Sequence, residues 1–138
     1  MFEKILVPVD LTEKNRRAVD TARKMAVGSG GKVTLFHVIE TLDLPFEELE
    51  DFYARLESRA AEGMDRLSAP LRDAGVEVVQ QVNYGDRAGE IVGYAEEGDF
   101  DLVVMSSRRI DPEERTGNWA TVSHKVAIMA RTPVLLVK

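Results

Sequence analysis

The chain contains no cysteine, which excludes disulfides, a thiolate nucleophile and any cysteine-ligated metal. With only two histidines in addition, the sequence offers no transition-metal site. Positive charge is in deficit, because 24 acidic residues against 18 Lys and Arg give a net charge of −6. Nucleic acid and anionic membranes require a basic face, so neither is expected as a partner.

Long apolar runs are missing as well. No stretch approaches the roughly 20 apolar residues that a membrane span requires. The N-terminal sequence MFEKILVPVD is too short and too soon charged to be a signal peptide. We therefore expect a soluble, cytoplasmic protein. Its 138 residues and 44% hydrophobic content are typical of one globular domain, covering residues 1–138.

Apolar strand patterns alternate with amphipathic helix patterns along the whole chain. Strands are expected over residues 4–10, 32–40, 76–82, 102–105 and 133–137. Continuous apolar character, as in Ile5 to Val9, is typical of strands that are buried on both faces of a parallel sheet. This order predicts an α/β fold, a three-layer α/β/α sandwich with right-handed crossovers.

Capping residues and glycines predict where the helices begin and end. Thr12 can cap a helix that begins at Glu13, and glycines at 28, 30 and 31 end it. A longer helix keeps one apolar stripe for about 25 residues from Phe46. Pro70 predicts either a kink or a stop near Ser68. A short third helix covers residues 88–95, and a fourth opens at Thr121.

Ligands of open parallel sheets bind outside the carboxyl ends of the strands, near the switch in strand order. Asp10 ends the first strand, where its carboxylate can accept a ribose hydroxyl or hold Mg²⁺; the alternative is that it caps the next helix. At the end of the fourth strand, Ser106 to Arg109 can cradle phosphates. Alternatively this is a solvated loop whose arginines pair with Asp111, Glu113 and Glu114.

Thr121, Val122 and Ser123 begin the last helix, whose unpaired N–H groups can bind an anion. The alternative is that Thr121 is simply an N-cap. His37 lies inside an apolar strand and is interpreted as a structural residue. The G-x-S-x-G motif of a serine hydrolase is absent.

Several segments taken together resemble the universal stress protein family: ILVPVD, VTLFHVIE, YGDRAGEI, LVVMSSR, TVSHKV and TPVLLVK. The resemblance covers the whole chain. It implies a five-stranded parallel sheet of order 3-2-1-4-5 with helices on both sides, the adenine nucleotide alpha hydrolase-like fold. Many members are homodimers, and the ATP-binding members carry G-x2-G-x9-G-[S/T] after the fourth strand.

The resemblance also implies which residues would contact ATP, with Mg²⁺ as a possible companion. Adenine and ribose would lie at Pro8, Val9, Asp10 and Val38. The phosphates would lie at Met105, Ser106, Arg108, Arg109, Ala120, Thr121, Val122 and Ser123. The three signature glycines are replaced by Ser106, Arg109 and Ala120, and ten residues rather than nine separate the last two.

Glycine permits positive φ and close approach of the backbone to phosphate, so these replacements favour the members of the family that do not hold ATP. The first hypothesis is therefore a non-enzymatic, homodimeric stress-response signalling or interaction module with a degenerate ATP-binding loop. The alternative is a switch that binds ATP or another adenine nucleotide. A slow ATP hydrolase ranks last, because no general base is evident near the phosphates.

The last strand is apolar and, in the resembling fold, lies at a sheet edge that invites pairing with a second chain. We expect a C2 homodimer with antiparallel pairing of these strands. The alternative is a monomer whose edge is blunted by Lys138. The predicted interface residues are Pro133, Val134, Leu135, Leu136 and Val137.

Overall fold

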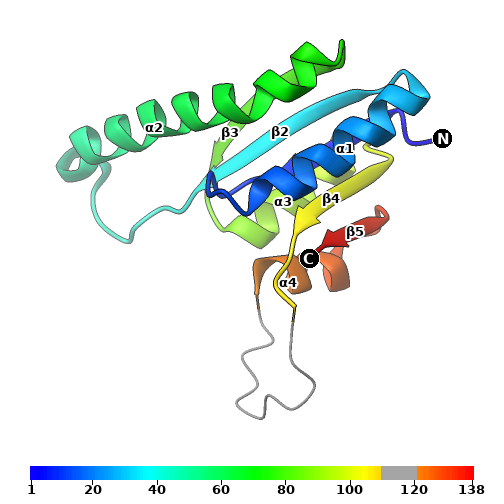
Figure 1. The fold of residues 1–138 in the computed structure, drawn as a ribbon. Helices are drawn as coiled ribbons and strands as arrows, with labels where there is room; N and C mark the ends of the chain where they lie inside the picture. Colours follow the sequence, from blue (N-terminus) through cyan, green and yellow to red (C-terminus); the bar gives the residue numbers. More distant parts are fainter. Residues whose placement is uncertain (110–120) are drawn as a thin grey trace.

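Strands and helices alternate throughout residues 1–109 and 121–138, the part of the chain that the computed structural model describes (Figure 1). The elements are β1 (Lys4–Pro8), α1 (Asn15–Ser29), β2 (Lys32–Ile39), α2 (Phe46–Asp73), β3 (Glu77–Tyr84), α3 (Arg87–Glu97), β4 (Leu102–Ser106), α4 (Val122–Met129) and β5 (Val134–Val137). No helix in these two ranges is long and apolar enough to cross a membrane.

All five strands form one parallel sheet of order β3-β2-β1-β4-β5, which confirms the predicted topology. The chain builds outward from β1 to β3 on one side, then crosses back to place β4 against the other side of β1. The order therefore reverses between β1 and β4. At such a switch point the connections leave the sheet in opposite directions, and a crevice opens beyond the carboxyl ends of the strands.

Two apolar cores cover the two faces of the sheet, because successive side chains of a strand point to opposite faces. Ile5 and Val7 of β1 lie in the core that includes residues of α1 and α2. Leu6, between them, lies in the core that includes residues of α3 and α4. Figure 1 shows the corresponding layers, with α1 and α2 in front of the sheet. Burial on both faces explains why β1 is apolar without alternation.

Two of the predicted helix boundaries are wrong. Helix α1 begins at Asn15, not Glu13, and Lys14 at its N-cap position provides no side-chain cap. The hydroxyl of Thr12 instead donates to Asp10 Oδ1. Helix α2 continues through Pro70 to Asp73, so of the two alternatives predicted at Pro70 the stop near Ser68 is wrong. Pro70 stands in the last turn, so the hydrogen bond that it removes and the clash of its ring with the preceding turn lie close to the end of the helix.

The connection from β1 to α1 has an unusual backbone. Leu11, directly after Asp10, has φ of 70°, a left-handed conformation that residues with a side chain rarely adopt. Its side chain packs against Gly63 of α2, where an added Cβ atom would lie 3.1 Å from the Leu11 Cδ2 atom. The chain is thereby turned so that Asp10 stays at the rim of the sheet.

Candidate functional site

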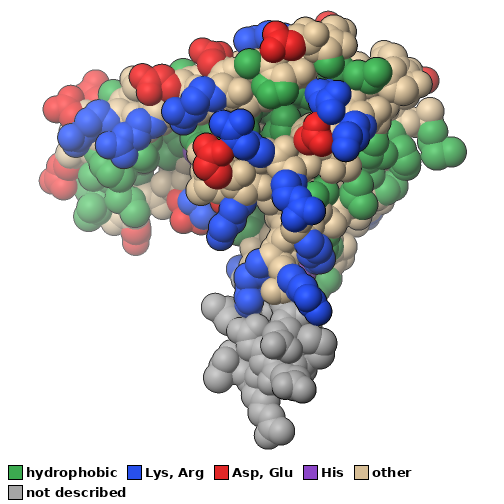
Figure 2. Space-filling view, in the orientation of Figure 1, with side chains coloured by type: hydrophobic (Ala, Val, Ile, Leu, Met, Phe, Trp, Pro, Cys, Tyr) green, Lys and Arg blue, Asp and Glu red, His purple; other side chains and the backbone are tan. Residues whose placement is uncertain are grey.

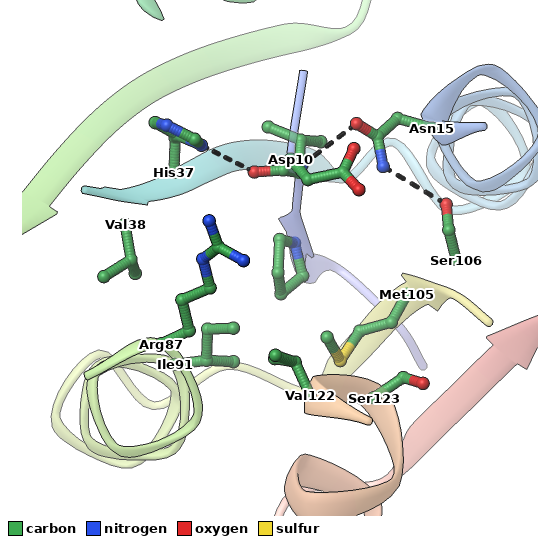
Figure 3. A pocket seen from close by; sticks show the side chains of 12 residues that line it. Asp10, Asn15, His37, Val38, Arg87, Ile91, Met105, Ser106, Val122 and Ser123 are labelled. Carbon is green, nitrogen blue, oxygen red and sulfur yellow. Dashed lines mark hydrogen bonds between the residues drawn. The ribbon is translucent and has the colours of Figure 1, made fainter. Parts of the chain in front are cut away.

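A pocket lies beyond the carboxyl ends of β1 and β4, at the switch point of the sheet (Figure 3). It brings together eight of the twelve residues predicted for the site, contributed by β1, the turn after it, β2, β4 and α4. These are Pro8, Val9, Asp10, Val38, Met105, Ser106, Val122 and Ser123. Four further residues, Asn15, His37, Arg87 and Ile91, complete the lining.

Asp10 is exposed at the rim of the pocket, and its carboxylate organises the turn that follows. The Oδ1 atom accepts hydrogen bonds from the Thr12 backbone N–H at 3.0 Å and from the Thr12 hydroxyl at 2.6 Å. This is an Asx turn rather than the helix cap offered as the alternative role. Figure 3 shows the carboxylate on the side of the pocket nearer Asn15 and Ser106. One carboxylate oxygen is thus structural, while a carboxylate can accept through both.

Asn15 is a site residue that the sequence analysis missed. It is only 2% exposed, and its side chain holds two parts of the wall together. Its Oδ1 atom accepts from the Asp10 backbone N–H at 3.0 Å, and its Nδ2 atom donates to the Ser106 hydroxyl at 3.3 Å. One sequence signal could have revealed it. Asn15 is a polar residue at a position that continues the buried stripe of α1, to which Ala18 and Val19 belong.

His37 was interpreted as a structural residue, and its Nδ1 atom does lie 2.8 Å from the Val9 carbonyl oxygen. That bond joins β2 to the end of β1, and the ring also lines the pocket. Arg87, the first residue of α3, was missed. Its guanidinium stands in the pocket between Val38 and Asp10 in Figure 3, and its Nε lies 3.5 Å from Glu40 Oε1.

Hydroxyl groups connect the opposite end of the pocket. The Ser106 hydroxyl donates to the Lys14 carbonyl at 3.1 Å while it accepts from Asn15. The Ser123 hydroxyl, buried at the start of α4, donates to the Ser107 hydroxyl at 3.2 Å. These bonds tie the end of β4 to α1 on one side and to α4 on the other. Both serines that line the pocket are therefore already engaged within the fold.

Three of the remaining predicted site residues are described by the structure and do not line this pocket. Arg108 and Arg109 follow β4 and are exposed. Thr121 is the N-cap of α4, because its Oγ1 accepts from the His124 backbone N–H at 3.4 Å. Ala120 lies outside the described residues, as do Asp111, Glu113 and Glu114, with which the arginines were alternatively expected to pair. Figure 2 shows Lys and Arg side chains gathered down the face that leads to the end of β4.

The lining combines apolar surface with a few polar groups, which is the usual composition of a small-molecule site. Val38, Ile91, Met105 and Val122 supply flat apolar contact at one end, and hydroxyl and amide groups stand at the other (Figure 3). Among residues 1–109 and 121–138 there is no group of three His, Asp or Glu side chains able to hold a metal ion. Within the same described ranges, Asp10 is the one carboxylate in the lining.

Comparisons with known proteins agree with this architecture. The chain is 26% identical to the universal stress protein YxiE of Bacillus subtilis over 151 residues, covering all of both proteins. The structure of protein MJ0577 of Methanocaldococcus jannaschii superposes with a TM-score of 0.81 at 27% identity, covering 100% of this chain and 96% of that one.

A universal stress protein from Archaeoglobus fulgidus, solved in complex with dAMP, has a TM-score of 0.75 at 23% identity, with both chains fully covered. These neighbours share the five-stranded parallel sheet and the adenine nucleotide alpha hydrolase-like fold expected from the sequence. The model of the universal stress protein family matches residues 1–138, which include all five strands and every residue of the pocket lining named above. The chain belongs to the universal stress protein family.

Proposed function

We propose that this protein is a non-enzymatic, homodimeric stress-response module of the cytoplasm that binds an adenine nucleotide mainly through its nucleoside. The observation that carries the proposal is the pocket at the switch point, around which Pro8, Val9, Asp10 and Val38 meet. Related folds have been solved in complex with cAMP and with dAMP, so this architecture accommodates adenine nucleotides elsewhere in the family.

Adenine fits the apolar end of the pocket, where Val38, Ile91 and Val122 offer apolar contact beside the Arg87 side chain. The ribose would then lie beside Asp10, whose carboxylate has acceptor capacity beyond the bonds to Thr12. Hydrogen bonds to a charged group typically contribute about 1.5–3 kcal/mol, so this contact would be the strongest polar one in the nucleoside half.

The end of the pocket at Ser106, where the phosphates would lie, would bind them more weakly than the apolar end binds the nucleoside. Ser106 stands where the ATP-binding members carry the first signature glycine, and its hydroxyl is shared between Lys14 and Asn15. Arg109, at the second glycine position, adds a long side chain where close backbone approach is needed. We therefore propose that the second and third phosphates of ATP add little affinity. Because Asp10 is the one carboxylate that residues 1–109 and 121–138 contribute to the lining, Mg²⁺ accompanying ATP would be held mainly by phosphate and water.

We propose that the protein is not an enzyme, and this proposal rests on the residues that line the same pocket. Among the residues that the structure describes, Asp10 is the one acidic side chain in the lining, and we assign it to the ribose contact and to the Thr12 turn. Hydrolysis of a phosphate bond requires a group that orients or deprotonates water beside the phosphates.

The dimer is proposed through β5, the outer strand of the sheet. Leu135 of that strand is 38% exposed, and Ile128 and Met129 at the end of α4 are 85% and 55% exposed. Burial of such side chains is favourable, and an unpaired strand edge can add a second copy of itself by backbone hydrogen bonds. The edge and these three side chains together fit an isologous interface.

A second candidate function is an interaction module that holds no nucleotide. The engaged hydroxyl of Ser106 and the exposed Arg109 favour it, because both replace glycines of the ATP signature. In this second candidate function the pocket is part of the family fold but holds no ligand, and the protein acts through the surface of its dimer.

Calorimetric titration with AMP and ATP distinguishes the two candidates. Binding of both nucleotides with similar affinity supports the proposal, whereas no binding of either favours the interaction module. ATP binding that is far tighter than AMP binding would contradict the weak phosphate end.

An Asp10→Asn variant tests the placement of the nucleoside. The amide retains an oxygen acceptor for Thr12 but replaces the other oxygen by an NH₂ group. We expect AMP affinity to fall about tenfold, the equivalent of one charged hydrogen bond. Asp20→Asn, on the exposed side of α1, is the matched control and should bind like wild type. Unchanged AMP affinity in Asp10→Asn would rule out the ribose contact.

A further inference from the structure

Arg87 occupies the nucleoside end of the pocket and has no assigned role. It is the first residue of α3, a helix that starts at the carboxyl edge of the sheet. Its guanidinium projects into the space bordered by Val38, Ile91 and Asp10 (Figure 3). The hydroxyl-bearing phosphate end, with Ser106 and Ser123, lies on the far side of Met105 and Val122 in the same view.

The position of Arg87 is not explained by helix stability. The N-terminus of a helix carries a partial positive charge, so a cation in the first turn is unfavourable by a few tenths of a kcal/mol or more. Asp86 already caps α3, since its side chain accepts from the Gly89 backbone N–H at 2.9 Å. The N-terminus of α3 is therefore capped without Arg87, and the positive charge of Arg87 slightly destabilises it.

The ion pair with Glu40 does not explain the position either. The Nε to Oε1 distance is 3.5 Å, and the two side chains are 46% and 56% exposed. Exposed pairs of this kind typically contribute between 0 and about 1 kcal/mol. Glu40 is thus a loose tether, which orients the guanidinium without removing it from the pocket.

Arg87 and Ile91 lie one turn apart on the same face of α3, and Val38 and Val122 complete the apolar lining at this end of the pocket. A nucleobase packed on Val122 would have its other face open to the Arg87 guanidinium. Guanidinium groups are planar and weakly hydrated, and they stack on aromatic rings. We infer that Arg87 is a positioning residue that stacks on the nucleobase and covers it from solvent. The ion pair with Glu40 orients the guanidinium for this contact.

This inference rests on the proposed function, because it specifies how the same pocket holds its ligand. It also specifies the ligand class. A purine presents a larger π surface than a pyrimidine, so stacking by Arg87 favours purine nucleotides over pyrimidine nucleotides of equal charge. Contact with phosphate would give no such preference between bases.

The test is calorimetric titration of AMP and UMP into wild type, Arg87→Ala, Arg87→Lys and Arg72→Ala. Arg72 is an exposed arginine in the last turn of α2 and controls for the loss of one positive charge. We expect Arg87→Ala to weaken AMP binding about fivefold to tenfold, the range of a partly desolvated cation–π contact. The ratio of AMP to UMP affinity should fall in the same variant.

The lysine variant separates stacking from charge. Lys keeps the positive charge but has no flat face, so Arg87→Lys should recover little of the lost AMP affinity. Full recovery by Lys, or AMP binding by Arg87→Ala that matches Arg72→Ala, would overturn the inference and leave nucleotide binding standing. Failure of wild type to bind AMP would overturn the proposed function, and the inference with it.

Discussion

The Nδ2 atom of Asn15 lies 3.3 Å from the hydroxyl of Ser106, which joins the start of α1 to the end of β4. The same side chain accepts from the backbone of Asp10, so one buried amide connects both strands that flank the switch point. The wall of the pocket at this end thus depends on one buried side chain that itself belongs to the lining.

Replacing Asn15 by Leu should destabilise the fold. The Leu side chain matches the volume approximately but leaves the Asp10 N–H and the Ser106 hydroxyl without this partner. A buried polar group left unsatisfied costs about 1–3 kcal/mol, so the free energy of unfolding should fall by that amount or more. Urea denaturation measures it.

Arg16→Ala is the neighbouring control. Arg16 is exposed and pairs with Glu13 on the surface, so its loss should change the free energy of unfolding by less than about 0.5 kcal/mol. Equal effects in the two variants would show that the Asn15 amide contributes no more than a surface position.

Thr121→Ala should lower the free energy of unfolding by about 1 kcal/mol, because it removes the N-cap of α4. Thr121→Ser retains the hydroxyl and should remain close to wild type. Urea denaturation of the three proteins checks both expectations. Equal stability of the Ala and Ser variants would mean that the capping hydroxyl is replaceable by water.

Stability should decline at high pH through Tyr84. Burial raises the pKa of the Tyr84 phenol, and its hydrogen bond to the Glu57 carboxylate raises it further, to about 12 from the ordinary 10.0. The fold therefore favours the neutral phenol. That contribution is fully present below pH 10 and is lost as the pH rises from 10 toward 12, because the unfolded chain releases the proton first.

Tyr84→Phe removes the titrating group and should flatten this part of the pH profile relative to wild type. Urea denaturation at a series of pH values up to 11 measures the difference between the two proteins. Glu57→Gln removes the charge that favours the neutral phenol, so absorbance titration should place the Tyr84 pKa nearer its ordinary value. An unchanged difference between wild type and Tyr84→Phe across that range would contradict the assignment.

Leu135→Asp should convert the proposed homodimer to a monomer, because a carboxylate on β5 would be buried against its copy across the two-fold axis. Leu44→Asp is the matched control, since Leu44 is 57% exposed on the connection between β2 and α2. Sedimentation at micromolar concentration should show dimeric wild type and Leu44→Asp. A monomeric wild type would refute the dimer.

The sheet was predictable because its signal is local. Four of the five strands are short and largely apolar runs, with β3 the polar exception, and the strand order follows once the family resemblance is recognised. The helix start was mispredicted for an equally physical reason. Thr12 has the right chemistry for an N-cap, but Asp10 two residues earlier competes for its hydroxyl and delays the helix to Asn15.

The lining residues that were predicted lie at the ends of β1 and β4, near the end of β2 and at the start of α4. Asn15 and Arg87 were not predicted, because their roles depend on contacts with residues that are distant in the sequence. Asn15 reaches Ser106, 91 residues later, and Arg87 reaches Glu40 from another element. One sequence alone does not show which distant residues lie in contact. From the sequence, Arg87 is therefore interpreted as an ordinary surface charge.

The packing of Leu11 against Gly63 has a consequence for surveys of variants. Any larger residue at Gly63 presses on Leu11, whose left-handed backbone directly follows Asp10. Such a substitution would disturb the rim of the pocket from the opposite layer of the molecule. A screen scored only by ligand retention would therefore class Gly63 as a binding residue, although it is absent from the pocket lining.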